Sequence, residues 1–341
     1  MKKTLTTSLF VLLAFSGYLQ AQSEPAPLTA AEKAEVIDSI SAQLERNYIF
    51  PEVATEMNAL LAKKLKGKKY DAIDDPSEFA MTLTTDLQSI SNDKHLRVSF
   101  NPQQVEELRA FAERQAENEE EEIPEAWLKS MARNNFGFKE MKILDGNIGY
   151  LDLRGFNDPA YAGETAVAAM NYFANADALI IDLRQNGGGS PGMIQLITSY
   201  LYGPEPVHLN NFYWRPTDQH TQTWTLPYVD GKRRPDIDVY VLTSSRTFSA
   251  AEEFSYNLRN LERATLVGET TGGGAHPGGS VVATDRFLVW VPQGRAINPI
   301  TNTNWEGTGV EPHVKVPAPE ALDKAHVLAM EKLLEKAKSH Q

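Results

Sequence analysis

The first third of the chain has apolar residues at helical spacing. They lie three or four positions apart in two runs, Ile37, Ile40 and Leu44 and then Phe79, Leu83 and Leu87. Such spacing places the apolar side chains on one face of a helix. Asp75-Pro76, before the second run, is typical of an N-cap followed by proline. We therefore predict a mainly helical region over residues 22–135, interrupted by a loop at 91–97.

The pattern changes after residue 136. Short apolar runs rich in β-branched residues now alternate with stretches at helical spacing. The runs are 148–153, 178–181, 239–242, 265–267 and 287–291. Residues 178–181 are apolar at every position, as in a strand that is buried on both faces of a sheet. This alternation of strands and helices predicts an α/β region over residues 136–341.

The N-terminus has the features of a secretory signal peptide. Two lysines follow Met1, an apolar stretch covers residues 9–15, and Ala21 precedes a polar segment. We predict cleavage after Ala21, with residues 1–21 removed, and a protein that is periplasmic or secreted. No later run has the ~20 apolar residues of a membrane span, and there is no cysteine to carry a lipid anchor.

The composition argues against several classes of function. The formal net charge is −12 at pH 7, and the basic residues form no stripe, so nucleic acid and anionic membranes are poor partners. The absence of cysteine excludes disulfides and thiolate catalysis. The seven histidines are scattered, with no His-Glu-x-x-His spacing. We therefore expect no metal site and no cofactor.

A serine follows the predicted strand at 239–242. Ser249 opens a helical run that continues with Ala250, Ala251 and Glu252. In one interpretation Ser249 is the N-cap of this helix, and Glu252 completes a capping box. In the other it is a nucleophile, because a serine at a strand-to-helix turn is exposed at the positive end of the helix dipole. These residues alone leave both interpretations open.

A glycine-rich loop follows the strand at 178–181. It reads Asp182-Leu-Arg-Gln-Asn-Gly-Gly-Gly-Ser190, and successive glycines let backbone N–H groups approach a ligand closely. The loop lacks the Gly-Lys-Ser/Thr of a phosphate-binding loop and the spaced glycines of a dinucleotide fingerprint. It therefore favours binding of an acyl oxyanion. We expect Asp182, Arg184 and Asn186 to hold the loop in place.

Four segments, taken in order, carry a resemblance to a known family. They are 182–189, 249–252, 268–276 and 306–312. Over most of its length the chain resembles the tail-specific (C-terminal processing) serine peptidases, in the branch related to the tricorn core peptidase and to interphotoreceptor retinoid-binding protein. The resemblance implies an α+β core of the ClpP/crotonase-like type and Ser249 as nucleophile. It also implies an oxyanion hole made by the N–H groups of Gly188, or Gly189, and of Ala250.

The resemblance leaves two candidates for the general base. Many processing peptidases carry a lysine in a segment that here reads Thr271–Gly274 and has none. The tricorn-like branch uses a histidine that matches His95, oriented by a glutamate that matches Glu306. A neutral imidazole suits this task near neutral pH. His276 lies close to the position of the family lysine and is the alternative base. His95 and Glu306 also have a simpler interpretation, as residues that only support their loops.

The substrate is less well defined by the sequence. Between Arg97 and Asn147 there are only about fifty residues, whereas a separate domain that captures peptide C-termini, such as a PDZ domain, needs roughly 80–100. We expect no such domain, and residues 212–214 are a candidate lining of a substrate cleft. The sequence thus predicts an exported serine peptidase of proteins or peptides, of unknown oligomeric state. The alternatives are a non-catalytic carrier of apolar ligands and a hydrolase of small esters or amides.

Overall fold

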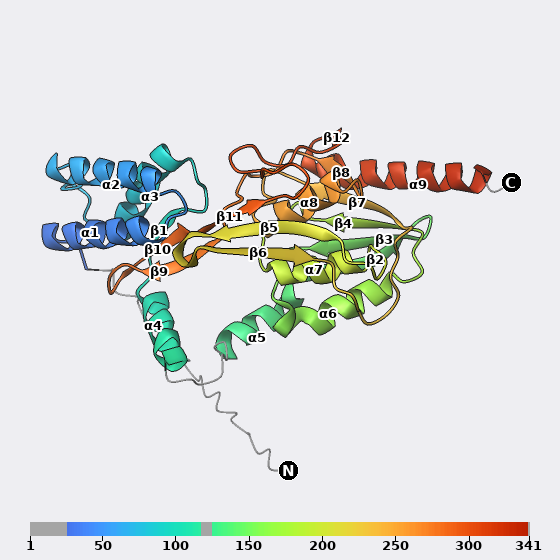
Figure 1. Ribbon diagram of the computed structural model, residues 1–341, viewed down its shortest axis with the longest axis horizontal. Helices are drawn as coiled ribbons and strands as arrows, with labels where there is room; N and C mark the ends of the chain where they lie inside the picture. The colour runs from blue at the N-terminus through green and yellow to red at the C-terminus, as the bar shows by residue number, and fades with distance from the viewer. Residues whose placement is uncertain (1–25, 117–124, 340–341) are drawn as a thin grey trace, which may run out of the picture.

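The computed structural model describes residues 26–116 and 125–339 (Figure 1). Three helices form the N-terminal part: α1 (Ala30–Asn47), α2 (Pro51–Lys66) and α3 (Pro76–Ser91). Thr29 and Glu32 make a capping box at the start of α1, and Asp75 caps α3 by accepting the N–H of Glu78. The apolar faces predicted for α1 and α3 are buried in a common core. The helical spacing of the sequence therefore matches the structure here.

A small sheet completes this core. It is antiparallel, in the order β1-β10-β9, and consists of β1 (Arg97–Phe100), β10 (Phe287–Pro292) and β9 (Gly278–Val282). Phe287, Val289 and Val291 pack among the helices α1 to α3. The strand predicted at 287–291 thus belongs to the N-terminal core, although almost two hundred residues separate it from β1. Helices α4 (Pro102–Ala116) and α5 (Glu125–Arg133) and the short helix η1 (Asn135–Gly137) follow β1 in the chain.

The central sheet has six strands in the order β12-β8-β7-β4-β3-β2. They are β2 (Phe138–Leu144), β3 (Ile148–Leu153), β4 (Ala178–Asp182), β7 (Asp238–Thr243), β8 (Thr265–Gly268) and β12 (Val314–Lys315). Strand β2 is antiparallel to β3, and the other neighbours are parallel. This mixed sheet with N-terminal helices confirms the predicted fold class.

Helices cover both faces of the central sheet (Figure 1). Helices α6 (Pro159–Tyr172), α7 (Pro191–Ser199) and α8 (Ala250–Asn260) pack on one face with Leu179 and Ile181 of β4. The short helix η3 (Ala318–Glu320) leads into α9 (Ala321–Ser339), which packs on the other face with Ala178 and Ile180. Because successive side chains of a strand point to opposite faces, β4 is buried on both, as its apolar sequence predicts.

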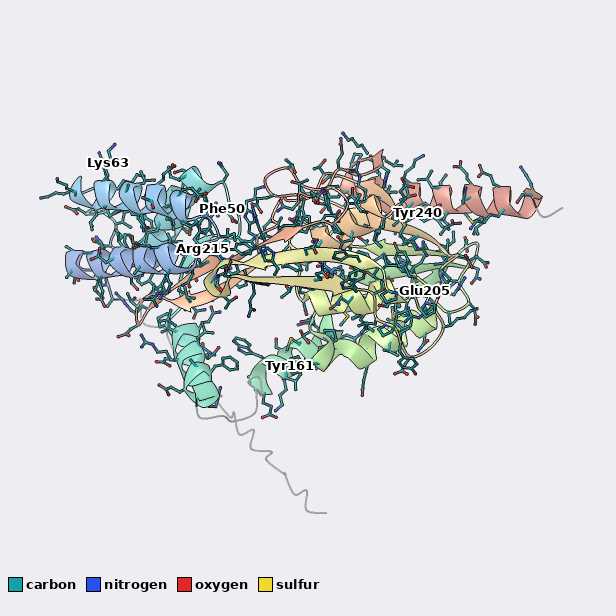
Figure 2. All side chains as sticks on the ribbon, viewed as in Figure 1. Phe50, Lys63, Tyr161, Glu205, Arg215 and Tyr240 are labelled. Atoms are coloured by element: carbon teal, nitrogen blue, oxygen red, sulfur yellow. The ribbon has the colours of Figure 1, made fainter. Side chains whose placement is uncertain are left out.

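A third sheet links the two cores. Its strands are in the order β11-β5-β6. Strands β5 (His208–Trp214) and β6 (Gln219–Trp224) are joined by the short helix η2 (Arg215–Thr217), and β11 is Gly294–Ile297. Phe212 packs into the core around α6 to α8, whereas Tyr213 packs against the N-terminal core. Arg215 donates from Nη1 to the carbonyl of Tyr48 at 2.8 Å, and Figure 2 shows it near Phe50 at the start of α2. The sheet therefore fixes the N-terminal helices against the rest of the chain.

The described residues contain no helix that is both long and apolar enough to span a bilayer. The signal peptide predicted at residues 1–21 lies outside the described residues.

Candidate active site

Ser249 lies between strand β7 and helix α8 in a strained conformation. Its φ of 56° and ψ of −123° are unusual for a residue other than glycine. Its backbone N–H donates to Oε2 of Glu252 at 2.9 Å, so it also occupies the N-cap position of α8. Backbone strain of this kind persists only where the surroundings enforce it, and it clusters at functional sites. Ser249 is thus the N-cap of α8, and its strain is of the kind found at functional sites.

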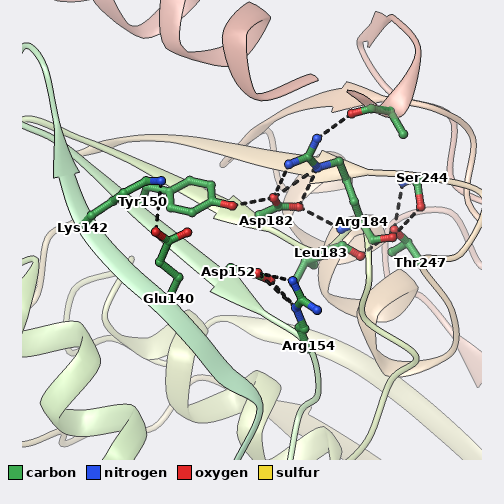
Figure 3. A network of polar contacts seen from close by, with 11 residues as sticks. Glu140, Lys142, Tyr150, Asp152, Arg154, Asp182, Leu183, Arg184, Ser244 and Thr247 are labelled. Carbon is green, nitrogen blue, oxygen red and sulfur yellow. Dashed lines mark hydrogen bonds and ion pairs between the residues drawn. The ribbon is translucent and has the colours of Figure 1, made fainter. Parts of the chain in front are cut away.

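The turn before Ser249 is tied to the loop that follows β4 (Figure 3). The hydroxyl of Ser244 donates to the carbonyl of Arg184 at 2.6 Å, and that of Thr247 donates to the carbonyl of Leu183 at 2.8 Å. The N–H of Phe248 donates to the carbonyl of Asn186 at 3.0 Å. These bonds fix the serine turn against the glycine loop.

Asp182 and Arg184 form the scaffold expected of them (Figure 3). Nε and Nη2 of Arg184 bond the two carboxylate oxygens of Asp182 at 2.9 and 2.6 Å. The hydroxyl of Tyr150 donates to the same carboxylate at 2.8 Å, and burial together with Asp182 raises the pKa of this tyrosine. Nη1 of Arg184 reaches the carbonyl of Ala318 at 2.6 Å. The ion pair thus braces the ends of several strands without facing Ser249.

The glycine loop lies directly against Ser249. Gly188 has a φ of 111°, and a Cβ at this position would lie 2.8 Å from Cβ of Ser249 and 3.0 Å from N of Ala250. The N–H of Gly188, however, donates to Oδ1 of Asn186 at 2.8 Å. Within the residues that the structure describes, the N–H groups of Gly189 and Ala250 make no hydrogen bond. The structure therefore favours Gly189 over Gly188 as the partner of Ala250 in an oxyanion hole.

His95 lies on the loop between α3 and β1 and packs against Phe248, the residue before Ser249. Its ring centroid is 4.6 Å from that of Phe248, and its side chain is 9% exposed. A Cβ at Gly274 would lie 2.7 Å from Cε1 of His95, so glycine is needed there. Burial lowers the pKa of His95 to about 4, against the raising effect of Asp93. Neither ring nitrogen is hydrogen-bonded within the described residues. The imidazole is thus neutral at pH 7 and has a free nitrogen.

Glu306 lies beside His276, not beside His95. Its Oε2 accepts the N–H of Ala275 at 2.5 Å and is 3.4 Å from Nδ1 of His276. The same Nδ1 is 2.8 Å from Oδ2 of Asp93. No hydrogen bond or ion pair joins Glu306 to His95 among the described residues. The expected direct pair of Glu306 with His95 is therefore not formed, and Asp93 lies between the two histidines.

Two carboxylates, Asp93 and Glu306, converge on Nδ1 of His276. Burial and the nearby Asp93 raise the pKa of Glu306 to about 7, although His276 and the N–H of Ala275 oppose this rise. One ligand atom from each of Asp93, His276 and Glu306 lies within 4.8 Å of the others, so this group has the composition of a cation site. The hydrogen bond between His276 and Asp93 accounts for the arrangement by itself. Asp93 is the member that was not predicted from the sequence, because no local pattern links it to His276, 183 positions away in the chain.

Sequence reasoning also missed the full role of Glu252. This buried carboxylate accepts the hydroxyl of Thr271 at 2.5 Å and the N–H groups of Gly273 and Gly274 at 2.6 and 2.8 Å. Burial raises its pKa, and these bonds oppose the rise. The capping-box pattern pointed to Glu252, but only as a helix cap. In the fold it also shapes the loop on which His95 packs.

Comparison with known families and structures places this site in context. Residues 147–316 match the model of peptidase family S41, and residues 28–135 match the N-terminal domain of that family in eukaryotic interphotoreceptor retinoid-binding protein. A proposed peptidase of Parabacteroides merdae is 18% identical, with a TM-score of 0.57 over 87% of this chain and 96% of its own. The tricorn protease is 14% identical, with a TM-score of 0.54 over 90% of this chain and 37% of its own.

A proposed S41 protease of Bacteroides fragilis is 22% identical, with a TM-score of 0.48 over 55% of this chain, and the chain spans 52% of its length. At these identities the Parabacteroides merdae peptidase and the tricorn protease show a shared fold. Membership of the family rests on the two family models, which match the N-terminal and the C-terminal parts of the chain in sequence order. The chain is a serine-type peptidase that belongs to peptidase family S41.

Proposed function

We propose that this protein is exported and hydrolyses peptide bonds of proteins or peptides through an acyl-enzyme on Ser249. The observation that carries the proposal is the strained φ of 56° at Ser249, at the N-terminus of α8 and against Gly188. Strain at a serine beside unpaired N–H groups is what an acyl-transfer site requires. The N–H groups of Gly189 and Ala250 then stabilise the oxyanion.

His95 is the general base in this mechanism. The oxygen of Ser249 attacks the substrate carbonyl and passes its proton to a free ring nitrogen of His95, which then protonates the leaving amine. His95 next takes a proton from the water that hydrolyses the acyl-enzyme and returns it to the oxygen of Ser249 as the acyl group leaves. His95 is preferred over His276 because its ring packs against Phe248, next to Ser249, and both of its ring nitrogens are without a partner among the described residues. His276 contacts Asp93 through Nδ1 and packs edge-on against Phe50 at 5.3 Å. The carboxylates of Asp93 and Glu306 supply negative charge for the imidazolium.

The substrate would bind between the N-terminal region, residues 22–135, and the catalytic region, residues 136–341. His95 comes from the first region and Ser249 from the second, so a chain bound between them meets both. Tyr213 packs at the junction of the two cores and is a candidate contact for substrate side chains. Export to the periplasm or the medium follows from the signal-peptide pattern of residues 1–21.

The test is hydrolysis of an unfolded protein by the mature chain and by its Ser249→Ala variant. We expect cleavage by the wild type alone, with the products identified by mass spectrometry. Cuts that cluster near C-termini would assign the enzyme to tail-specific processing. Activity on small esters without cleavage of peptides would favour the ester hydrolase. Equal inactivity of both forms on all acyl substrates, with tight binding of an apolar ligand, would favour the carrier.

A further inference from the structure

We propose that His276 is a positioning residue that joins the carboxylates of Asp93 and Glu306 into one acidic unit behind the base, His95. The inference rests on the proposed function, because it assigns a role within the same site. It differs from the mechanism expected from the sequence, in which Glu306 alone orients His95 and His276 is only a rival base.

The geometry of His276 suits a bridge between two acids. Nδ1 carries at most one proton, and it faces both Oδ2 of Asp93 at 2.8 Å and Oε2 of Glu306 at 3.4 Å. The ring is held by Phe50 and by burial, with His276 only 6% exposed. Nδ1, held between the buried Asp93 and the partly buried Glu306, is poorly placed to take a proton from Ser249, so that only Nε2 could act as a base. Nδ1 is well placed to keep the two acids together.

Asp93 links the position of His276 to the position of the base, His95. Its Oδ1 accepts the backbone N–H of His95 at 3.0 Å and lies 3.9 Å from Nδ1 of the same residue. Asp93 is 1% exposed and also accepts the hydroxyl of Tyr48 at 3.4 Å. Because Asp93 holds both the loop of His95 and the ring of His276, removal of His276 should loosen the position of His95.

The charges around Glu306 give the bridge a second effect. Two acids, Asp93 and Glu252, lie near Glu306, and His276 is the basic group that faces Glu306. The hydroxyl of Tyr48 lies beyond Asp93. Asp93 raises the pKa of Glu306, and His276 lowers it. Loss of His276 should therefore raise this pKa further, whereas loss of the Asp93 charge should lower it. Two variants of the same unit thus have opposite effects on pH dependence.

The experiment compares His276→Ala with His276→Asn on a peptide chosen from the cleavage products. The amide of asparagine can place an N–H where Nδ1 stands, but it cannot act as a base. We expect His276→Ala to lower kcat about 100-fold, as misplacement of a catalytic group does, with KM nearly unchanged. The acid limb of the pH profile of kcat that reflects protonation of Glu306 should move to higher pH. His276→Asn should recover most of the lost rate. His326→Ala serves as the control and should match the wild type in kcat, because His326 is a partly exposed residue of α9 whose ring contacts the carbonyl of Asp145 and not the candidate site.

The possible results separate this inference from the proposed function. If both His276 variants are inactive while His95→Ala is active, His276 is the base and the inference is wrong. An alanine variant with the rate and pH profile of the wild type would also overturn it. If His276→Ala does not fold, Asp93→Asn decides, because its acid limb should move to lower pH, and a limb that stays in place contradicts the bridge. Activity in Ser249→Ala would instead reject the proposed function.

Discussion

Gly188 is a position where one added methyl group should damage the chemistry more than the fold. Its φ of 111° is one that L side chains rarely adopt, and such a conformation costs ~1–3 kcal/mol for alanine. The new Cβ would also lie 2.8 Å from Cβ of Ser249 and 3.0 Å from N of Ala250. Both atoms are fixed by the backbone and cannot rotate away. Gly188→Ala should therefore push apart the nucleophile and the glycine loop.

The expected sizes of the two effects differ. For 341 residues, an unfolding entropy of ~2.1 cal/mol/K per residue converts the strain into a fall in Tm of about 1–4 °C. Displacement of the nucleophile or of an oxyanion donor lowers kcat by roughly 100-fold to 1,000-fold. The variant should therefore remain folded at the assay temperature and still be nearly inactive.

Gly187→Ala is the matched control, since a Cβ at Gly187 meets no atom within 4 Å. Tm is measured by scanning calorimetry, and kcat and KM are measured on one defined peptide. We expect Gly187→Ala to keep the Tm of the wild type and most of its kcat. The reasoning is refuted if Gly188→Ala keeps kcat within about threefold of the wild type, or if the two variants are equally impaired.

Three further predictions concern pH, stability and metal. On the acid side kcat should fall in two steps, near pH 7 as Glu306 takes up a proton and near pH 4 as His95 does. Glu306→Gln should remove the first step and leave the second, and a step near pH 7 that survives this change contradicts the assignment. Burial raises the pKa of Glu253 to about 7, so ionisation costs stability as pH rises from 4.5 through 7. Glu253→Gln should then stabilise the protein by up to about 3 kcal/mol at pH 8 and by little at pH 4, and equal effects in denaturant melts at both pH values argue against this. Excess EDTA should leave activity unchanged, whereas a loss that Zn²⁺ restores would show that Asp93, His276 and Glu306 hold a metal.

Local features of the sequence determined much of the fold. The helical spacing at Ile37, Ile40 and Leu44 and the N-cap at Asp75 both reappear in the structure. The apolar run at 178–181 is a strand buried on both faces. These features depend on residues close together in the chain, where hydrophobic periodicity and capping act directly. The same holds for Ser249, whose strand, turn and helix are contiguous.

Only the tertiary structure decided which distant residues meet. Strand β10 pairs with β1 across almost two hundred residues and completes the N-terminal core. Glu306 lies beside His276, and Asp93 contacts both histidines, although the sequence suggested a direct pair of Glu306 with His95. Such contacts depend on the paths of three loops, and these paths are fixed by how sheets and helices pack, not by neighbours in sequence. The sequence by itself determined the chemical groups and their local elements, whereas the packing of the two cores decided how those groups are paired.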